Sequence, residues 1–218
     1  MARPGVSQMR RKQLIEATVA AIHTHGYDAT TMAKIAQRAG MSPGLIAHYF
    51  GSKGDLLEAT MRSLLTELQM LAAQRLGQAG DAPRARLAAI VSANFDDSQC
   101  ATQTVAAWLA FWGQVPHEPK LGRLQRIYRR RLHSNLKREF GRLGLGPDDA
   151  AHLAEVTASL IDGVWVRAGL DGGGLDTAAA RRLVTETIDL HLAARGVPRE
   201  GLPPAMQTEA AHRKRKTA

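Results

Sequence analysis

Apolar residues recur along this chain at intervals of three and four residues, the spacing of one face of an α-helix. Leu14, Ile15, Val19 and Ile22 are one example. No segment alternates with a period of two for long enough to indicate a strand, and glycine and proline divide the helical stretches. The pattern predicts an all-α protein with helices near residues 7–25, two short ones within 31–50, and longer ones near 53–76, 83–95, 100–115, 120–142, 148–170 and 177–194.

The two short helices within residues 31–50 are separated by a tight turn. Gly40 stands where a left-handed residue ends a helix, and Ser42-Pro43 is typical of an N-cap followed by the first helical position. Ser52 and Asp55 then form a capping-box pattern that opens the long helix from residue 53. This layout is typical of a helix-turn-helix, which places its second helix in the DNA major groove.

The second short helix predicts a surface for double-stranded operator DNA. Leu45, Ile46 and Phe50 would point inward, leaving its other residues to face a partner. We expect Thr31, Tyr49 and Lys53 to hold phosphates and Pro43, Gly44 and His48 to lie against base edges. A surface histidine with no DNA contact is the alternative for His48. The predicted DNA-contacting set is Thr31, Ser42, Pro43, Gly44, His48, Tyr49 and Lys53.

Aromatic residues gather in the second half of the chain. Helical spacing brings Trp108, Phe111 and Trp112 together, and places Asp162 one turn before Trp165. Ring faces beside an anion suit a small organic cation such as a quaternary ammonium. The alternative is ordinary core packing, which is the commoner fate of an aromatic cluster. The predicted ligand-binding set is Trp108, Phe111, Trp112, Tyr128, Asp162 and Trp165.

The composition bounds the class of protein. The chain of 218 residues has a net charge of +9, which favours polyanionic partners, and a lone cysteine, Cys100, which suits a reducing compartment. The N-terminus lacks the apolar stretch of a signal peptide, and no apolar run approaches a membrane span, so we expect a cytoplasmic protein with no membrane partner. Residues 120–142 hold nine Lys and Arg against one Glu, either as a solvated helix face or as a field that attracts DNA.

The organisation predicted from these patterns has three parts. Residues 1–55 form a helix-turn-helix DNA-binding domain, and residues 56–195 form a helical domain for ligand binding and dimerisation. Residues 196–218 contain three prolines, few apolar residues and a terminal basic cluster, which predicts a disordered basic tail.

An enzymatic function has little support in the sequence. HExxH, CxxC, GxSxG and glycine-rich phosphate-loop motifs are absent, and Cys100 has no flanking catalytic motif. We therefore predict no catalytic residue, no metal and no cofactor. A small helical enzyme and a nonspecific DNA-coating protein remain the alternatives from other classes, and the second would need a larger basic face around the head.

The string AGMSPGLIAHYFGSKGDLLEA, at residues 39–59, closely resembles the signature of TetR-type bacterial repressors. One departure is Ala47, where that family usually has an aromatic residue. Farther on, four body segments resemble the choline-responsive regulators of glycine betaine synthesis within that family: NFDDSQ, AWLAFW, RRRLHSNL and LIDGVWVRAGLDGGGLD. The resemblance spans most of residues 7–195.

This resemblance implies a dimeric transcriptional repressor of the genes that convert choline to glycine betaine, relieved by choline. A related trimethylammonium compound, or a different organic cation, is the open alternative. The homodimer would form through the helices near 148–170 and 177–194, with candidate contacts at Leu160, Ile161, Leu183, Ile188 and Leu192. The helix from residue 53 would carry the signal between the two domains.

Overall fold

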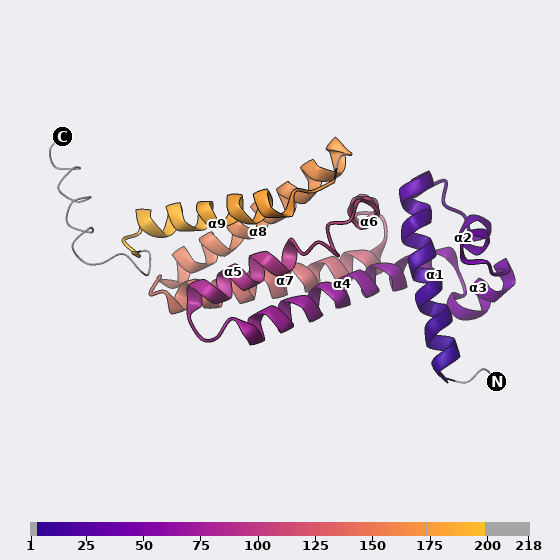
Figure 1. Cartoon of the computed structure of the whole chain (residues 1–218), viewed down its shortest axis with the longest axis horizontal. Coiled ribbons are helices and arrows are strands. Elements are labelled where there is room, and N and C mark those ends of the chain that lie inside the picture. Colours follow the sequence, from indigo (N-terminus) through magenta and orange to yellow (C-terminus); the bar gives the residue numbers. More distant parts are fainter. Residues whose placement is uncertain (1–3, 173, 199–218) are drawn as a thin grey trace.

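The computed structural model describes residues 4–172 and 174–198, and within them all regular secondary structure is helical, which confirms the all-α prediction. The helices are separated by short turns and follow the sequence pattern closely (Figure 1). In chain order they are α1 (Pro4–His25), α2 (Met32–Ala39), α3 (Pro43–Phe50), α4 (Lys53–Gln78), α5 (Pro83–Asn94), α6 (Thr102–Gln114), α7 (Pro119–Arg142), α8 (Pro147–Asp171) and α9 (Thr177–Ala194).

Side-chain caps set the boundaries of the helix-turn-helix. The hydroxyl of Thr31 accepts a hydrogen bond from the Lys34 amide, and that of Ser42 accepts one from the Leu45 amide, each at 3.3 Å. Gly40 ends α2 with a φ of 62°, a left-handed conformation that glycine adopts without strain. Ser52 caps α4 by accepting from the Asp55 amide at 3.1 Å. The predicted turn and caps are therefore confirmed.

The head has a small core of its own. Leu14 of α1, Ile35 of α2, Ile46 of α3 and Leu56 of α4 are completely buried against one another. This packing leaves α3 on the outside of the molecule, at the end remote from the body (Figure 1).

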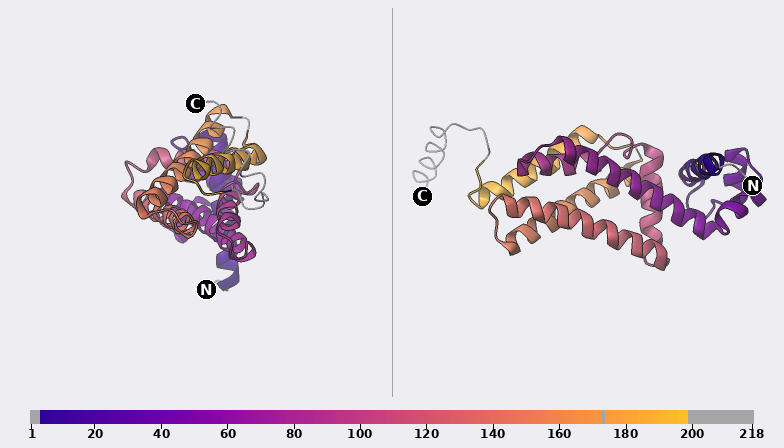
Figure 2. Two further views of the ribbon diagram at one scale, coloured as in Figure 1. Left: turned by 90° about the vertical axis from the view of Figure 1, so that its left-hand side faces the viewer. Right: turned by 90° about the horizontal axis from the view of Figure 1, so that it is seen from below.

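The body is a bundle of α4–α9 around a second core. The long helix α4 begins in the head and runs along the body, beside α5 and α7 (Figure 2). The shorter α6 lies where head and body meet, and packs against α1 of the head and against α8 (Figure 1). The body therefore touches the head through α6 as well as through the continuous α4.

Helices α6 and α8 approach each other closely at Gly169. A Cβ atom at Gly169 would lie 2.0 Å from Cδ1 of Leu109, so any larger residue there would displace the Leu109 side chain. These are the two helices that carry the three tryptophans.

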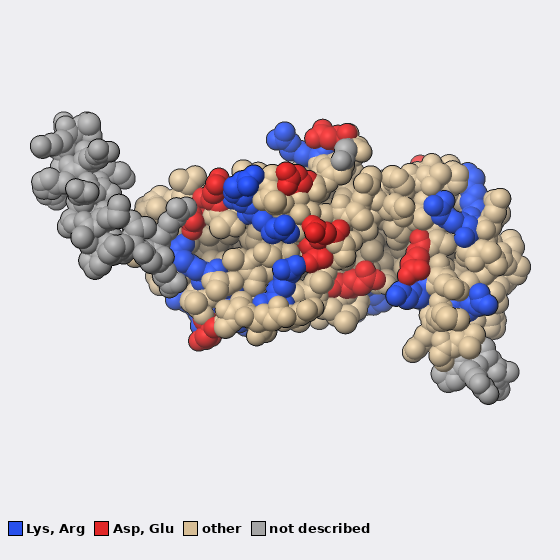
Figure 3. All heavy atoms as spheres, viewed as in Figure 1, with Lys and Arg blue, Asp and Glu red and all other residues tan. Residues whose placement is uncertain are grey.

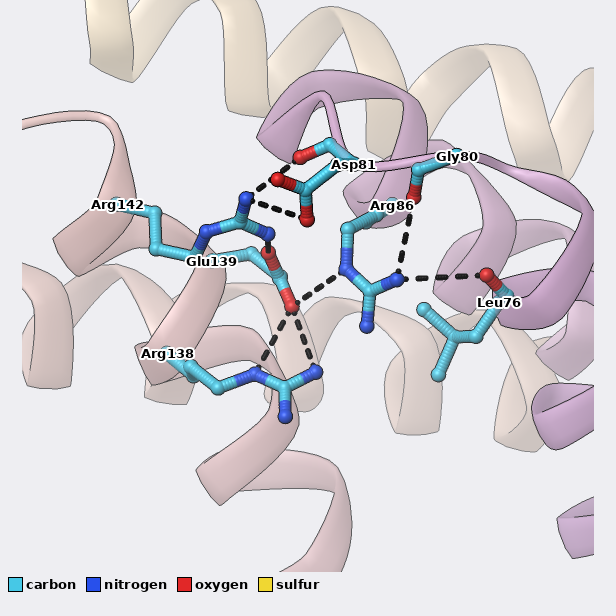
Figure 4. Close-up of polar contacts among 7 residues, drawn as sticks. All are labelled: Leu76, Gly80, Asp81, Arg86, Arg138, Glu139 and Arg142. Atoms are coloured by element: carbon cyan, nitrogen blue, oxygen red, sulfur yellow. Dashed lines mark hydrogen bonds and ion pairs between the residues drawn. The ribbon is translucent and has the colours of Figure 1, made fainter.

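A buried carboxylate holds together the end of the body remote from the head (Figure 4). The side chain of Glu139 is inaccessible to solvent and accepts from Arg86 Nε at 2.9 Å, Arg138 Nη2 at 2.8 Å and Arg142 Nη1 at 2.8 Å. Arg86 also donates to the carbonyl oxygens of Leu76 and Gly80. Burial alone would raise the pKa of Glu139, but the hydrogen bonds from the three arginines outweigh it and leave the pKa lowered. This Glu139 clasp joins the end of α4 to α5 and α7.

The basic excess of α7 is partly neutralised within the molecule. Besides the clasp, Lys120 lies 2.8 Å from Asp55 of α4, and Arg129 lies 3.5 Å from Glu155 of α8. Acidic and basic side chains are interspersed over the face of the body in Figure 3. The basic side chains of this stretch stay exposed, as the solvated-face interpretation expects, and the ion pairs add contacts with α4 and α8 that a linear charge pattern does not reveal.

The packed part of the body extends into the predicted tail, which was expected to begin at residue 196. Val197 packs against the body core, and Arg84 donates to the carbonyl oxygen of Pro198 at 2.8 Å. The rest of the expected tail, from residue 199, lies outside the described residues.

Three of the expected dimer contacts lie inside one subunit. Ile161, Ile188 and Leu192 are buried in the body core, so their assignment to an interface was wrong. Leu183, also expected, is exposed, and Leu160 is partly buried against the core; α8 and α9 further expose the apolar side chains of Val166, Leu170 and Leu190. Over the described ranges, no helix combines the length and apolarity that crossing a bilayer would require.

Candidate DNA-binding and ligand sites

The exposed surface of α3 and its preceding turn is the candidate DNA-binding site. Ser42, Pro43, Gly44 and His48 are exposed there, and Tyr49 is half-buried. Thr31, at the start of α2, is also exposed, although its hydroxyl is already a cap acceptor. The same is true of Ser42, so both hydroxyls order the helix starts whose backbone amides would face a phosphate. The predicted base-edge residues lie together, and their contacts with DNA remain predictions.

Lys53 has a partner within the head. Its ammonium donates to the carbonyl oxygens of Tyr27 at 3.3 Å and Asp28 at 3.5 Å, and lies 5.3 Å from the centre of the Tyr27 ring. It thus ties the start of α4 to the α1–α2 turn. A phosphate contact by Lys53 would have to add to these bonds or replace them.

Arg11 is a head residue that the sequence analysis did not identify. Its guanidinium lies 4.3 Å from the centre of the Phe50 ring and donates to the carbonyl oxygen of Tyr49 at 2.6 Å. It therefore holds the last turn of α3 from the side of α1. The contact spans 38 positions, so no local pattern could have revealed it.

The predicted ligand-binding aromatic residues meet inside the body. The Trp108 ring centroid of α6 lies 6.0 Å from Trp112, 6.2 Å from Tyr128 of α7 and 6.3 Å from Trp165 of α8. Together with Asp162, Asn94 and Leu68 these rings line a cavity of about 10 Å³, close to the space of a single water molecule. We call these seven residues the aromatic cage: Leu68, Asn94, Trp108, Trp112, Tyr128, Asp162 and Trp165.

Phe111 takes a different position from the rest of the predicted set. It is completely buried in the body core and does not line the cage. Positions 111 and 112 point about 100° apart around a helix, so the two cannot both face one small cavity. Asn94 and Leu68 take part instead, and both come from helices far away in sequence.

The cage contains polar atoms without a partner in the protein. Trp108 Nε1, Trp112 Nε1 and Asp162 Oδ1 are buried and form no hydrogen bond within the described part of the chain. Burial raises the pKa of Asp162 to about 6, Arg129 lowers it in part, and Glu155 raises it further. Two donors and one acceptor are therefore available to a ligand that brings a hydroxyl.

The cage combines aromatic rings with a single carboxylate. In residues 4–172 and 174–198, no group of three His, Cys, Asp or Glu side chains is arranged to hold a metal ion. Ring faces around one carboxylate instead attract a large, weakly hydrated organic cation.

Comparison with known proteins agrees with both halves of this architecture. Residues 14–60 match the family described as bacterial regulatory proteins, tetR family, and residues 83–193 match the one described as BetI-type transcriptional repressor, C-terminal. The chain therefore belongs to the TetR family of bacterial regulatory proteins, and its C-terminal domain is of the BetI type.

Individual relatives support the same assignment. The chain is 50% identical over 195 residues to the HTH-type transcriptional regulator BetI of Burkholderia thailandensis, covering 89% of this chain and 100% of that one. It is 48% identical over 193 residues to the BetI of Burkholderia lata, covering 88% and 99%. These relatives are transcriptional regulators, so the protein is a DNA-binding repressor and not an enzyme.

Solved structures share the fold. A putative transcriptional regulator from Pseudomonas aeruginosa superposes with a TM-score of 0.73 at 28% identity, covering 88% of this chain and 95% of that one. A putative regulator from Saccharomonospora viridis, solved in complex with choline, has a TM-score of 0.70 at 22% identity, covering 83% and 96%.

Proposed function

We propose that this repressor controls genes for the conversion of choline to glycine betaine, and that choline relieves the repression. The observation that carries the proposal is the aromatic cage, in which three indoles and a phenol surround a space next to the Asp162 carboxylate. The BetI-type match over residues 83–193 and the choline complex of the Saccharomonospora viridis protein support the same ligand.

The chemistry of the cage suits a trimethylammonium group. Such a group cannot donate a strong hydrogen bond, and it is held by the negative faces of aromatic rings at roughly 0.5–2 kcal/mol per contact. The choline hydroxyl would meet the polar atoms of the cage, accepting from a tryptophan Nε1 and donating to Asp162. Glycine betaine carries a carboxylate in place of that hydroxyl, so Asp162 would repel it.

Binding requires the cage to widen. A space of about 10 Å³ admits one water, and a trimethylammonium group needs several times that. The rings of Trp108 and Trp112 on α6 would have to move apart from Trp165 on α8. A ligand would thus favour a different α6–α8 arrangement by its differential affinity for the two states.

The packing of α6 suggests how ligand binding in the cage would be transmitted to the DNA-binding head. This helix carries Trp108 and Trp112 and contacts α1, while α4 contributes Leu68 to the cage and continues into the head. Displacement of either helix would turn the head. In a homodimer that reads two major-groove half-sites, a small turn changes the half-site spacing and lowers DNA affinity.

The DNA site and the dimer belong to the same proposal. We assign phosphate contacts to Thr31, Tyr49 and Lys53, base-edge contacts to Pro43, Gly44 and His48, and the start of the recognition helix to Ser42. The dimer would form through the apolar side chains that α8 and α9 expose. A repressor of this family that senses a different organic cation is the alternative, since the cage recognises the ammonium more than the rest of the ligand.

Titration calorimetry and tryptophan fluorescence test the ligand assignment. Wild type should bind choline more tightly than glycine betaine, and Trp108→Ala should weaken choline binding by at least about tenfold. Equal choline affinity in wild type and Trp108→Ala would show that the cage is only core packing. Tight binding of betaine without choline binding would reverse the assigned signal.

A further inference from the structure

A second, much larger cavity lies directly beside the aromatic cage. It has a volume of about 650 Å³, against about 10 Å³ for the cage, and lies between α4, α5 and α7. Leu68, Asn94 and Tyr128 line both cavities, so these three residues form the wall between them. We call the larger one the wide cavity.

Two of the three wall residues, Asn94 and Tyr128, are polar and contact each other. The hydroxyl of Tyr128 donates to Oδ1 of Asn94 at 3.0 Å, which is a hydrogen bond between two neutral groups. Rotation of the Tyr128 side chain would join the two spaces. The volume of the wide cavity falls within the ~300–1,000 Å³ of sites for drug-sized ligands, which is far more than choline alone would fill.

The wide cavity is apolar in its inner part and polar in its outer part. Its inner walls are apolar, with Leu65, Ile90 and Leu124 among them. Exposed polar side chains, including Arg62, Gln69 and Arg131, line its outer part. Arg62 is paired with Glu58 at 2.6 Å, whereas Arg131 donates to the neutral amide oxygen of Gln69. Arg131 is thus the guanidinium best placed to receive an anion.

Arg131 lies one helical turn after Tyr128, a residue of the cage. It follows Tyr128 by three residues on α7, so the two side chains share a face with Cβ atoms about 5–6 Å apart. Phosphocholine carries its phosphate beyond the position of the choline hydroxyl, so with the ammonium in the cage this phosphate would extend through the wall toward Arg131. A group attached one carbon from the nitrogen would remain in the cage beside Asp162.

We propose that the cage and the wide cavity form one elongated site, which accepts cholines that carry an anionic group on the oxygen, the phosphocholine class. The trimethylammonium would occupy the cage, the linker would pass between Tyr128 and Asn94, and the phosphate would accept hydrogen bonds from Arg131. This rests on the proposed trimethylammonium function of the cage. The elongated site would also discriminate between two compounds that carry an anionic group. The carboxylate of betaine would be repelled by Asp162, whereas the phosphate of phosphocholine would be attracted by Arg131.

The test measures choline, phosphocholine and glycine betaine binding by calorimetry in wild type and two matched variants. Arg131→Gln removes the proposed anion contact. Arg123→Gln removes the same charge from an exposed position of α7 that lines neither the cage nor the wide cavity. Wild type should bind phosphocholine within about tenfold of choline, and Arg131→Gln should weaken phosphocholine by about tenfold, the effect of one charge-assisted hydrogen bond at a partly solvated site. Arg131→Gln should leave choline affinity unchanged, and Arg123→Gln should alter the affinity for neither ligand.

Charge retention and salt provide the remaining controls. Arg131→Lys should keep most of the phosphocholine affinity, and added salt should weaken phosphocholine more than choline, because Arg131 is exposed. Choline binding without phosphocholine binding would overturn the elongated site while leaving the choline function intact, as would equal loss of both ligands in Arg131→Gln. Phosphocholine binding that depends on Arg131, without choline binding, would support the elongated site and refute choline as the signal.

Discussion

The hydroxyl of Tyr128 donates a hydrogen bond to the Asn94 side chain at 3.0 Å, and this pair separates the aromatic cage from the wide cavity. Two further hydrogen bonds hold Asn94. Its side-chain amide nitrogen donates to the backbone carbonyl of Ile90 at 2.9 Å, and its backbone carbonyl accepts from Trp165 Nε1 at 3.2 Å. Asn94 is therefore the immobile member of the pair, and Tyr128 is the one that can move.

This difference predicts distinct effects of two substitutions at position 128. Tyr128→Phe keeps the ring of the cage and loses only the hydroxyl, so choline affinity should stay within about threefold of wild type. Tyr128→Ala removes a wall and should weaken choline by at least about tenfold. Calorimetry distinguishes them, and identical losses in both variants would show that the hydroxyl, rather than the ring, holds the ligand.

Choline binding should depend on pH through Asp162. Its pKa is raised to about 6, and a cation in the cage favours the ionised form. Affinity should therefore be nearly constant above about pH 7 and fall as the pH drops through 6, by up to about tenfold per unit. Asp162→Asn should bind choline more weakly at neutral pH with a flat profile. A wild-type profile that is flat between pH 5 and 8 would contradict the role of this carboxylate.

The Glu139 clasp should stabilise the folded protein at neutral pH and lose this effect in acid. Glu139→Gln leaves three arginines without their anion and should lower the free energy of unfolding by about 2–3 kcal/mol, less than the ~3–5 kcal/mol of a fully buried pair because Arg138 and Arg142 reach solvent. The folded-state pKa of Glu139 is lowered, so its contribution is fully present above the unfolded pKa of about 4.3.

As the pH falls through the lower folded-state pKa, that contribution should disappear and the two proteins should converge in stability. Chemical denaturation of both proteins at pH 7 and near pH 3 provides the measurement. A constant difference across this range would exclude a charge-based contribution.

Lys53 should contribute to DNA affinity equally for every DNA sequence. Lys53→Ala should weaken binding to operator and random DNA alike and reduce the salt slope by about one unit, as expected for one lost phosphate contact. Lys137→Ala, an exposed lysine of α7 in the body, is the matched control and should change neither. Because Lys53 also binds the carbonyls of Tyr27 and Asp28, the melting temperature of both variants must be compared. Unchanged affinity for both DNAs would refute the phosphate contact.

The homodimer should depend on the exposed apolar residues of α8 and α9. Leu183, with 48% of its surface exposed, is a suitable position, and Leu183→Asp should lower both the molecular mass in solution and the operator affinity while leaving helicity intact. Met70→Asp is the control, since Met70 of α4 is 67% exposed outside those helices. A wild-type protein that is monomeric at micromolar concentration would refute this assembly.

Local patterns predicted much of this molecule. Helix positions, the Gly40 turn and the Ser42 and Ser52 caps follow from interactions between residues at most five positions apart, and these are present in the sequence as motifs. The approach of Trp108 and Trp112 follows from helical spacing in the same way.

The parts that were missed depend on how helices pack. Helical spacing could not tell which side of α6 would face Tyr128 and Trp165, so Phe111 was grouped with the two tryptophans although it points into the core. Asn94, Leu68 and the Glu139 clasp join segments far apart along the chain, and the wide cavity is a property of three helices together. The mistaken dimer contacts have the same origin, since an apolar stripe does not reveal whether it is covered by its own subunit or by a partner.

The most direct test of the account is the affinity of the purified protein for its operator, selected from genomic fragments, during titration with choline. Choline should lower operator affinity by about 5–150-fold, a coupling of ~1–3 kcal/mol, and Trp108→Ala should bind the operator normally but lose the response. Glycine betaine should have a much smaller effect at the same concentration. Operator binding that is unchanged at saturating choline would contradict the central claim that the cage controls the DNA-binding head.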